Sequence, residues 1–374
     1  MLHRSKSRLA VAAAAGTVCA LIAVGAALAA PTPPWSKKNP AVPNAYTNTT
    51  PALSEIQVQG QVGTFLAWKG QYDNKVKYKY RLNGKWYATS IIPGALTNTS
   101  PSAALFATKL GKQAVLVAWK ALGSGGLSAI KYSDGVVANN GSINWTTPHV
   151  LPGGHYSETT ASPALLFPAN TKTPQVILAY RGPFDHVRVA VGTAVGTTGR
   201  KFSWGKTAWI GPGTKAEPTT TSAQPALAEI LGAGGNGTVY VFWKGEGTVA
   251  PISYATTPDL VGSGLGGAAT PPWTVPSTVP DSGGIAGLAQ TTGSPAVSSA
   301  DVHGDGPLLL AYKGPSGFYI RFQTFSLGAW SQPHQFVNGN NNTTALGPAL
   351  VHGILANVSR TNGRIFLHHY LLPA

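Results

Sequence analysis

Short apolar runs broken by Gly, Pro, Asn and Ser fill the chain beyond residue 45, and two kinds of phrase keep returning. The first holds a proline in a Thr- and Ser-rich setting, as in TNTTPAL at 47–53. The second ends in an aromatic residue, a cation and a small residue, as in FLAWKG at 65–70. The prolines are Pro51, Pro101, Pro163, Pro225, Pro295 and Pro348. In the first five units the aromatic follows its proline by 17 or 18 residues, which indicates one repeated hairpin.

The spacing of these units predicts the architecture. Successive prolines lie 50, 62, 62, 70 and 53 residues apart, and most units contain four short apolar runs separated by turn residues. Such runs are typical of four antiparallel strands, and four-stranded units at this spacing are typical of β-propeller blades. We therefore predict an all-β, six-bladed β-propeller, with five or seven blades as the alternative. The blades are expected to start near residues 47, 97, 159, 221, 291 and 344.

The two ends of the repeat region are expected to share a sheet. The segment PPWSKKNPAVPN at 33–44 matches the tryptophan-to-proline phrase that closes the other units. Pairing it with the last unit would leave no exposed sheet edge. The last unit shows only the runs PALVHGILANV and GRIFLHHYLL, so this blade is predicted to hold either three or four strands.

Residues 1–29 read as a secretory signal peptide, which leaves one propeller domain at 30–374. Arg4, Lys6 and Arg8 precede a long apolar run, and small residues around Ala29 offer a cleavage site. An uncleaved membrane anchor is the alternative, because the run is long. Cleavage would give a secreted protein with no stable membrane span. It would also remove Cys19, the chain's one cysteine, so no disulfide is expected.

The composition of the chain bears on its secondary structure and on the kinds of partner it could bind. Charged residues make up 10% of the chain, which carries 45 Gly and 29 Pro, a mixture that disfavours long helices. Beyond the signal, 24 Lys and Arg stand against 12 Asp and Glu, a net charge of +12. The cations are scattered rather than clustered, which favours anionic surfaces over nucleic acid as partners. A basic solvated surface with no specific partner is the alternative.

Both repeated phrases are expected to lie on one face of the disc, because one begins strand one and the other ends strand two. That face would carry a ring of aromatic residues and cations, with His368 or Tyr370 at the sixth position. The alternative is that the aromatics fill the wedge between neighbouring sheets. The predicted ligand-binding residues are Trp68, Lys69, Trp119, Lys120, Tyr180, Arg181, Trp243, Lys244, Tyr312 and Lys313. Asp73, Asp185 and Glu246 follow the phrase and are candidate supporting carboxylates.

The blade phrases resemble those of secreted bacterial propellers of the sialidase-like group, and those of six-bladed fucose-binding lectins. The resemblance rests on SPAL, AWKG, a tryptophan and PG, and spans nearly all of the chain beyond the signal. It implies a propeller that acts on or binds sugars. The chain departs from both groups: Tyr180 with Arg181 lacks the lectins' recurring glutamate. Ser133, Asp134, Gly135 and Trp145 follow the order of a sialidase Asp-box but not its spacing.

Few residues point to catalysis or to a metal. A glycosidase needs two positioned carboxylates. The best register match, Glu55 with Glu229, places them in opposite blades, too far apart for one acid–base pair, and they are expected to bind backbone or water. The loop DVHGDGP at 301–307 imitates a calcium loop but has Tyr312 where a carboxylate is required. We predict no catalytic residue, metal or cofactor.

The first functional hypothesis is a secreted, non-enzymatic, lectin-like protein that binds carbohydrate or an anionic surface polymer through one face. The alternatives are a sialidase-like glycoside hydrolase, with an asymmetric site near Asp73, Asp185 or Glu246, and a scaffold for protein partners.

Overall fold

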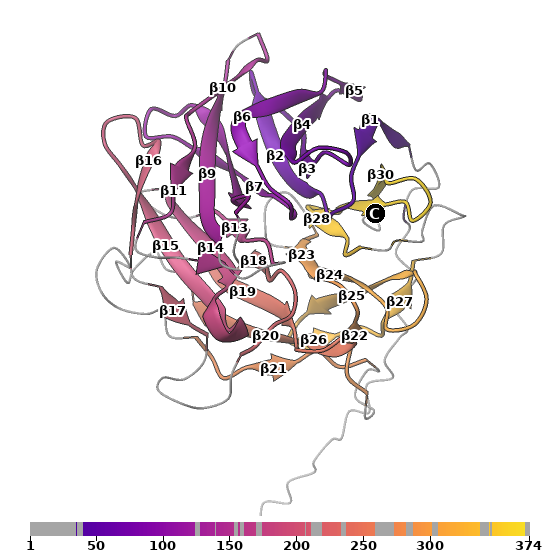
Figure 1. Cartoon of the computed structure of the whole chain (residues 1–374). Helices are drawn as coiled ribbons and strands as arrows, with labels where there is room; N and C mark the ends of the chain where they lie inside the picture. Colours follow the sequence, from indigo (N-terminus) through magenta and orange to yellow (C-terminus); the bar gives the residue numbers. More distant parts are fainter. Residues whose placement is uncertain are drawn as a thin grey trace, which may run out of the picture.

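The computed structural model shows six β-sheets arranged around a central axis (Figure 1). It describes Trp35 and residues 40–370, apart from 124–127, 139, 153–155, 158–160, 170–173, 206, 211–218, 233–236, 259–272, 282–286, 301–305, 337–343 and 345. The predicted signal peptide and residues 301–305 of the calcium-like loop lie outside the described residues. In the described part of the chain, no helix is long and apolar enough to cross a membrane.

Each sheet is one blade, and the six-bladed prediction is confirmed. The outer strand of most blades is split into short segments that pair with strand three. Blade 1 holds β2 (Ala52–Val58), β3 (Gln61–Lys69), β4 (Lys75–Leu82), β5 (Lys85–Trp86) and β6 (Ser90–Leu96). Blade 2 holds β7 (Ser102–Ala107), β8 (Gln113–Lys120), β9 (Ser128–Val137), β10 (Ile143–Trp145), β11 (His149–Val150) and β12 (Tyr156–Ser157). Blade 3 holds β13 (Ala164–Leu166), β14 (Gln175–Arg181), β15 (Val187–Val195), β16 (Lys201–Trp204) and β17 (Ala208–Trp209), with a short 3-10 turn, η1 (Pro183–Asp185), after β14.

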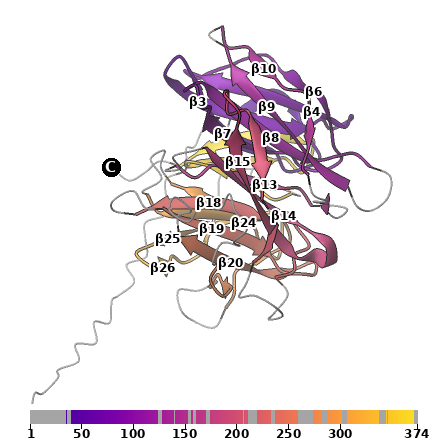
Figure 2. The ribbon, with the colours of Figure 1, turned by 90° about the vertical axis from the view of Figure 1, so that its left-hand side faces the viewer.

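The remaining blades continue around the disc. Blade 4 holds β18 (Ala226–Leu231), β19 (Gly237–Lys244), β20 (Ala250–Pro258), β21 (Ser277–Thr278) and β22 (Gln290–Thr291). Blade 5 holds β23 (Ala296–Ser299), β24 (Leu308–Lys313), β25 (Ile320–Ser326), β26 (Ala329–Trp330) and β27 (His334–Gln335). Blade 6 holds β28 (Ala349–Val351), β29 (Ile354–Val358), β30 (Arg364–His369) and β1 (Ala41–Tyr46). In the view turned by 90°, blades 1 and 2 lie above blades 4 and 5, with β14 and β15 between them (Figure 2).

The chain closes its own ring in blade 6, as the sequence predicted. Strand β1 pairs antiparallel with β30, with Ala41 opposite Phe366, and Trp35 is bridged to Tyr370. The blade has four strands, so the three-strand alternative is wrong. The sequence left the strand count open because it does not reveal the turn between β28 and β29. This turn consists of His352 and Gly353, with φ values of 39° and 72°. So short a turn leaves PALVHGILANV looking like a single strand.

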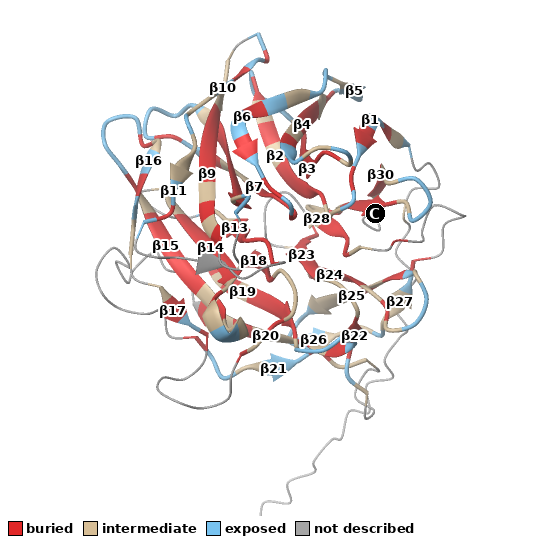
Figure 3. Cartoon of the chain, in the orientation of Figure 1, coloured by how far each residue is buried: buried red, intermediate tan, exposed pale blue. Residues whose placement is uncertain are grey.

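Large aromatic side chains fill the wedges between blades (Figure 3). The aromatic of each repeated phrase packs into the cluster of the preceding blade; for example, Trp119 joins Phe65 and Tyr78 of blade 1. A second tryptophan from each blade, on or beside its outer strand, joins the cluster between that blade and the preceding one. The two series together are Trp68, Trp119, Tyr180, Trp243, Tyr312, and Trp35, Trp86, Trp145, Trp204, Trp273, Trp330.

Blade 6 replaces the phrase aromatic with a polar pair. Asn357 occupies the position of Trp68, because Ala349 pairs with Ala356 as Ala52 pairs with Ala67. His368 Nε2 lies 2.7 Å from Asn357 Oδ1, and both residues are fully buried. His368 also contacts the ring of Phe336 in blade 5. The expectation that His368 or Tyr370 completes a cation ring is therefore wrong, because the cation position is held by Val358.

The buried histidine predicts how stability varies with pH. Burial, with a smaller contribution from His369, lowers the pKa of His368 to about 4. Since the unfolded chain takes up the proton near pH 6.5 and the folded chain only near pH 4, stability is lost as pH falls through that window. We expect His368→Gln to remove up to about 3 kcal/mol of this loss. Urea unfolding at pH 7.5 and pH 4.5 measures it, and equal pH dependence in both proteins would contradict the assignment.

Candidate functional site

The face on which the repeat prolines lie, here called the proline face, brings together two sets of loops. These are the leading loops before strand one and the loops between strands two and three. Backbone hydrogen bonds join them around the disc: Thr97 N donates to Asn74 O at 2.8 Å and Thr344 N to Phe318 O at 2.7 Å. The placement of both phrases on one face therefore holds.

In five of the six blades, a threonine four residues before the proline organises the leading loop, and the equivalent position in blade 3 lies outside the described residues. Thr47 Oγ1 accepts a hydrogen bond from Thr49 N at 3.1 Å, and Thr97, Thr221, Thr291 and Thr344 accept the equivalent bond. All five threonines are buried. Such a side chain closes a local turn, and its hydroxyl provides the backbone N–H of the loop with a hydrogen-bond acceptor within the protein. The recurring threonine in TNTTPAL is thus a turn signal that sequence reasoning left unused.

The five phrase aromatics are inside the protein. Trp68, Trp119, Tyr180, Trp243 and Tyr312 are each at most 3% exposed. Their rings fill the interblade wedge, which is the alternative that the sequence left open. Ligand binding by these rings stays a prediction, and their burial does not favour it.

The cations that follow these aromatics anchor the leading loops. Lys69 Nζ donates to Asn48 Oδ1 at 2.9 Å and to Gly70 O at 3.1 Å. Lys244 Nζ donates to Ser222 Oγ at 2.6 Å and to the carbonyl of Gly247. Burial lowers the pKa of Lys69 and of Lys244, as it does for Lys120 and Lys313. Because the ammonium hydrogens of Lys69 and Lys244 bond within the protein, these cations stabilise the loops.

The three candidate carboxylates differ in their contacts. Asp185 forms an ion pair with Arg181, the cation of its own phrase. Asp73 Oδ2 instead lies 3.0 Å from Lys77 Nζ, a lysine on strand β4. Glu246 is exposed. The first two carboxylates therefore order the loops between strands two and three.

The small residue of the phrase makes room for a second cation. Lys77 and Arg188 lie directly across the sheet from the phrase aromatics Trp68 and Tyr180. A Cβ added at Gly182 would lie 2.4 Å from Arg188 Cδ, so the arginine crosses over a residue that must lack a side chain. The strand pairing also places Lys131 and Arg321 at this position, in blades 2 and 5. Sequence reasoning missed this series.

Blades 1 and 3 each have a loop of similar sequence that carries a solvent-exposed aromatic ring. In both blades, the phrase glycine is followed by one further residue, then an aromatic, then an aspartate. These are Tyr72 and Asp73 in blade 1, and Phe184 and Asp185 in blade 3. Tyr72 is 93% exposed and Phe184 80% exposed. Both Phe184 and Asp185 have left-handed backbone conformations, with φ near 60°. The ion pairs of the two aspartates thus hold loops whose rings point into solvent.

Exposed aromatic residues gather on the proline face. In the described part of the chain six aromatic side chains are exposed, and five lie on or beside this face. The five are Tyr46, Tyr72, Phe184, Trp209 and Tyr319, whereas Tyr87 lies towards the other end of its blade. Exposed aromatics concentrated in one place are typical of binding surfaces.

The central channel widens to a cavity of about 270 Å³ between the six inner strands. Its lining is mostly leucine, alanine and valine, with Glu55, Glu229 and His352 among the polar residues. Glu229 Oε2 accepts a hydrogen bond from Ala169 N at 2.8 Å, and His352 Nε2 lies 3.9 Å from Glu55 Oε1. The two glutamates line one cavity from opposite blades, and Glu229 binds backbone, as the sequence indicated.

The residues that imitate an Asp-box form an interblade clamp. Asp134 has a fully buried side chain, accepts a hydrogen bond from Thr146 Oγ1 at 2.8 Å, and forms an ion pair with Arg200 of blade 3. Among the described residues no group of His, Cys, Asp or Glu could hold a metal ion.

Two solved structures share the fold over most of the chain. An α-L-arabinanase of Penicillium chrysogenum, complexed with arabinobiose, matches with a TM-score of 0.54 and 13% identity, covering 90% of this chain and 98% of its own. A Hadza microbial sialidase matches with a TM-score of 0.53 and 15% identity, covering 87% of this chain and 66% of its own, just under two thirds. No family model and no curated protein matches. These likenesses show the fold.

The anchoring role of the phrase lysines makes a stability prediction. We expect Lys244→Met to keep the buried stem but lose the hydrogen bonds to Ser222 and Gly247, destabilising the protein by about 1–3 kcal/mol. The exposed Lys85→Met is the matched control and should stay within about 0.5 kcal/mol of wild type. Thermal unfolding measures both, and equal stability of the two variants would contradict an anchoring role.

Proposed function

We propose that this protein binds carbohydrate on its proline face, through the exposed rings of the loops between strands two and three. The observation that carries the proposal is the pair of matching loops that present Tyr72 and Phe184 almost fully to solvent. A soluble protein gains nothing in folding stability from rings held away from its core, so their exposure favours a binding role.

The chemistry of a flat ring suits a sugar. One face of a pyranose carries mainly C–H groups, which bury apolar area against an aromatic ring while the hydroxyls stay in water. The ion pairs of Asp73 and Asp185 order the two loops before any ligand arrives. A ring that is already held in place loses little conformational entropy on binding.

The distribution of these rings favours a polymer over a single sugar. Blades 1, 3 and 5 carry Tyr72, Phe184 and Tyr319 in the corresponding loops, so aromatic contacts recur on alternate blades around the disc. Several weak contacts on one chain of sugars combine into strong overall attachment. The net charge of +12 beyond the predicted signal supports an anionic polymer as partner. Export by the predicted signal peptide belongs to the same proposal.

The test is binding to immobilised polysaccharides by Tyr72→Ala, Phe184→Ala and the double variant. We expect each single variant to weaken attachment at least about fivefold and the double variant more than about fiftyfold, because the contacts act together. Leu110→Ala is the control, since Leu110 is 62% exposed on the opposite face. Wild-type binding that survives in the double variant would contradict the proposal.

A second candidate is glycoside hydrolysis, for which the comparisons give more support than for a purely lectin-like role. Both neighbours reported above carry the names of enzymes that act on sugars. Within this chain, the channel brings Glu55 and Glu229 to one cavity, and hydrolysis of a glycosidic bond uses two carboxylates. The ion pairs of Asp73 and Asp185 with Lys77 and Arg181 make those two carboxylates weaker candidates.

Release of reducing sugar from arabinan and from sialylated and uronate-containing glycans separates the two candidates. For a binding protein we expect no turnover above buffer. Turnover that falls more than about 100-fold in Glu55→Gln or Glu229→Gln would instead establish an enzyme with its site in the channel.

A further inference from the structure

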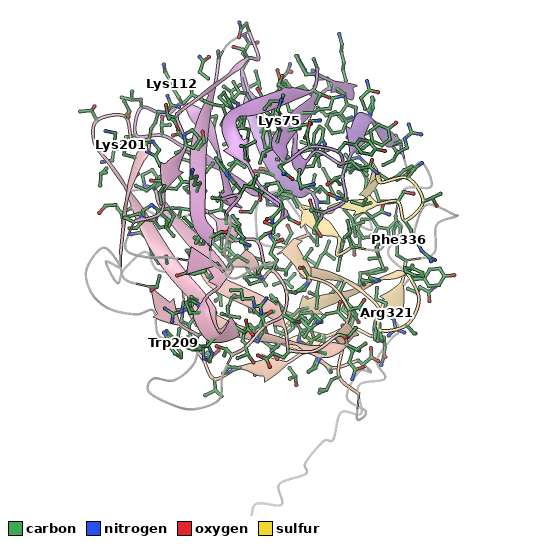
Figure 4. All side chains as sticks on the ribbon, in the orientation of Figure 1. Lys75, Lys112, Lys201, Trp209, Arg321 and Phe336 are labelled. Atoms are coloured by element: carbon green, nitrogen blue, oxygen red, sulfur yellow. The ribbon has the colours of Figure 1, made fainter. Side chains whose placement is uncertain are left out.

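One of the ten tryptophans does not pack between the blades. The other nine belong to the clusters between blades, where they fill the wedges. Trp209, in β17, is 50% exposed and joins none of these clusters. Figure 4 shows it at the periphery of the disc. A large apolar side chain kept half in water, outside the core, calls for a separate explanation.

Two polar side chains flank this tryptophan. Arg188 lies opposite Trp209 in the strand register, and its Cζ is 5.0 Å from the centre of the indole ring. The ring of His186, which lies just before β15 and two residues before Arg188, has its centre 4.5 Å from the indole. We call His186, Arg188 and Trp209 the blade 3 cluster.

The arginine of the cluster has no carboxylate partner among the residues that the structure describes. Arg188 Nε and His186 Nδ1 are both buried and make no hydrogen bond there. Arg321, at the same register position in blade 5, lies 3.5 Å from Asp281, and Arg200 and Arg181 also pair with aspartates. A guanidinium offers five donors in a planar fork that fits a carboxylate.

The cluster is held rigidly. Val187 N donates to Thr219 O and Gly182 N to His186 O, each at 2.8 Å, so both sides of the segment are pinned. The side chain of Arg188 crosses Gly182, where a Cβ would lie 2.4 Å from Arg188 Cδ. Behind it, burial raises the pKa of Tyr180 to about 12, so this phenol stays neutral beside the arginine. The guanidinium thus lies over the indole ring in a cation–π contact, with its Cζ 5.0 Å from the ring centre, and both groups are held as one unit.

We infer that the blade 3 cluster binds a carboxylated sugar, such as a uronic acid unit of an anionic polysaccharide. The carboxylate accepts hydrogen bonds from the guanidinium of Arg188, and the sugar packs against the exposed part of Trp209. Because one pyranuronate ring carries both an anion and an apolar face, it suits a fork and an indole at this separation. The inference rests on the proposed function and names the class of sugar.

Isothermal titration with tetramers of galacturonate and of glucuronate, each beside its methyl ester, tests the inference. We expect wild-type protein to bind at least one acid form at least tenfold more tightly than its ester. Arg188→Ala should lose that preference, Arg188→Lys should retain part of it, and Trp209→Ala should weaken acid and ester alike. Lys131→Ala, at the same register position in blade 2 but opposite Val150, is the matched control and should bind as wild type does.

Several results would overturn the inference. Equal affinity for acid and ester in wild-type protein does so without any variant, which keeps the test valid if Arg188→Ala fails to fold. An equal loss in Lys131→Ala would reduce the effect to net charge. Polyglutamate binding as tightly as the uronates would assign the cluster to acidic polypeptides. Sugar binding that depends on Tyr72 and Phe184 without any acid preference removes this inference alone, whereas no sugar binding at all removes the proposed function as well.

Discussion

The burial of one large aromatic from each of five blades against the blade before it holds the disc together. Each sheet is twisted, so neighbouring blades diverge outwards and leave a wedge that only a large side chain can fill. Truncating a buried Trp to Ala typically costs about 3–5 kcal/mol, and the wedge repeats around the ring. The second tryptophan series, on or beside the outer strands, fills the same gaps nearer the rim. Blade 6 departs from the series with its Asn357–His368 pair, at the sheet where the chain closes on itself.

This use of the repeated phrase bears on the proposed binding site. Phrase aromatic and phrase cation are both committed to the frame, the first to the wedge and the second, at Lys69 and Lys244, to the leading loop. The phrase therefore recurs for structural reasons. Variation falls on the loops between strands two and three, and there Tyr72 and Phe184 are displayed to solvent. Because the repeated residues stabilise the propeller, we propose that recognition falls to loop residues outside the repeat.

The sequence allowed prediction of the frame because the frame is periodic. Proline spacing and the constant distance to the aromatic predicted six blades, and the match at 33–44 predicted the closure. The buried lysines were hidden because Lys is normally exposed, and only tertiary contacts show that Lys244 Nζ meets Ser222 and Gly247. Arg188 and Trp209 stand 21 residues apart, and no local pattern reveals that the register sets them opposite each other. The exposed rings did leave a signal: an aromatic followed by aspartate, at the same offset after Trp68 and Tyr180.

A crystal structure of the protein soaked with an anionic oligosaccharide would test most directly whether recognition belongs to the loops rather than to the repeated phrase. We expect sugar density on the proline face, against Tyr72, Phe184 or Trp209, with the interblade aromatics unmoved. Sugar lodged between blades on the rings of Trp68, Trp119 or Trp243, or held in the central channel beside Glu55 and Glu229, would contradict this division between frame and loops.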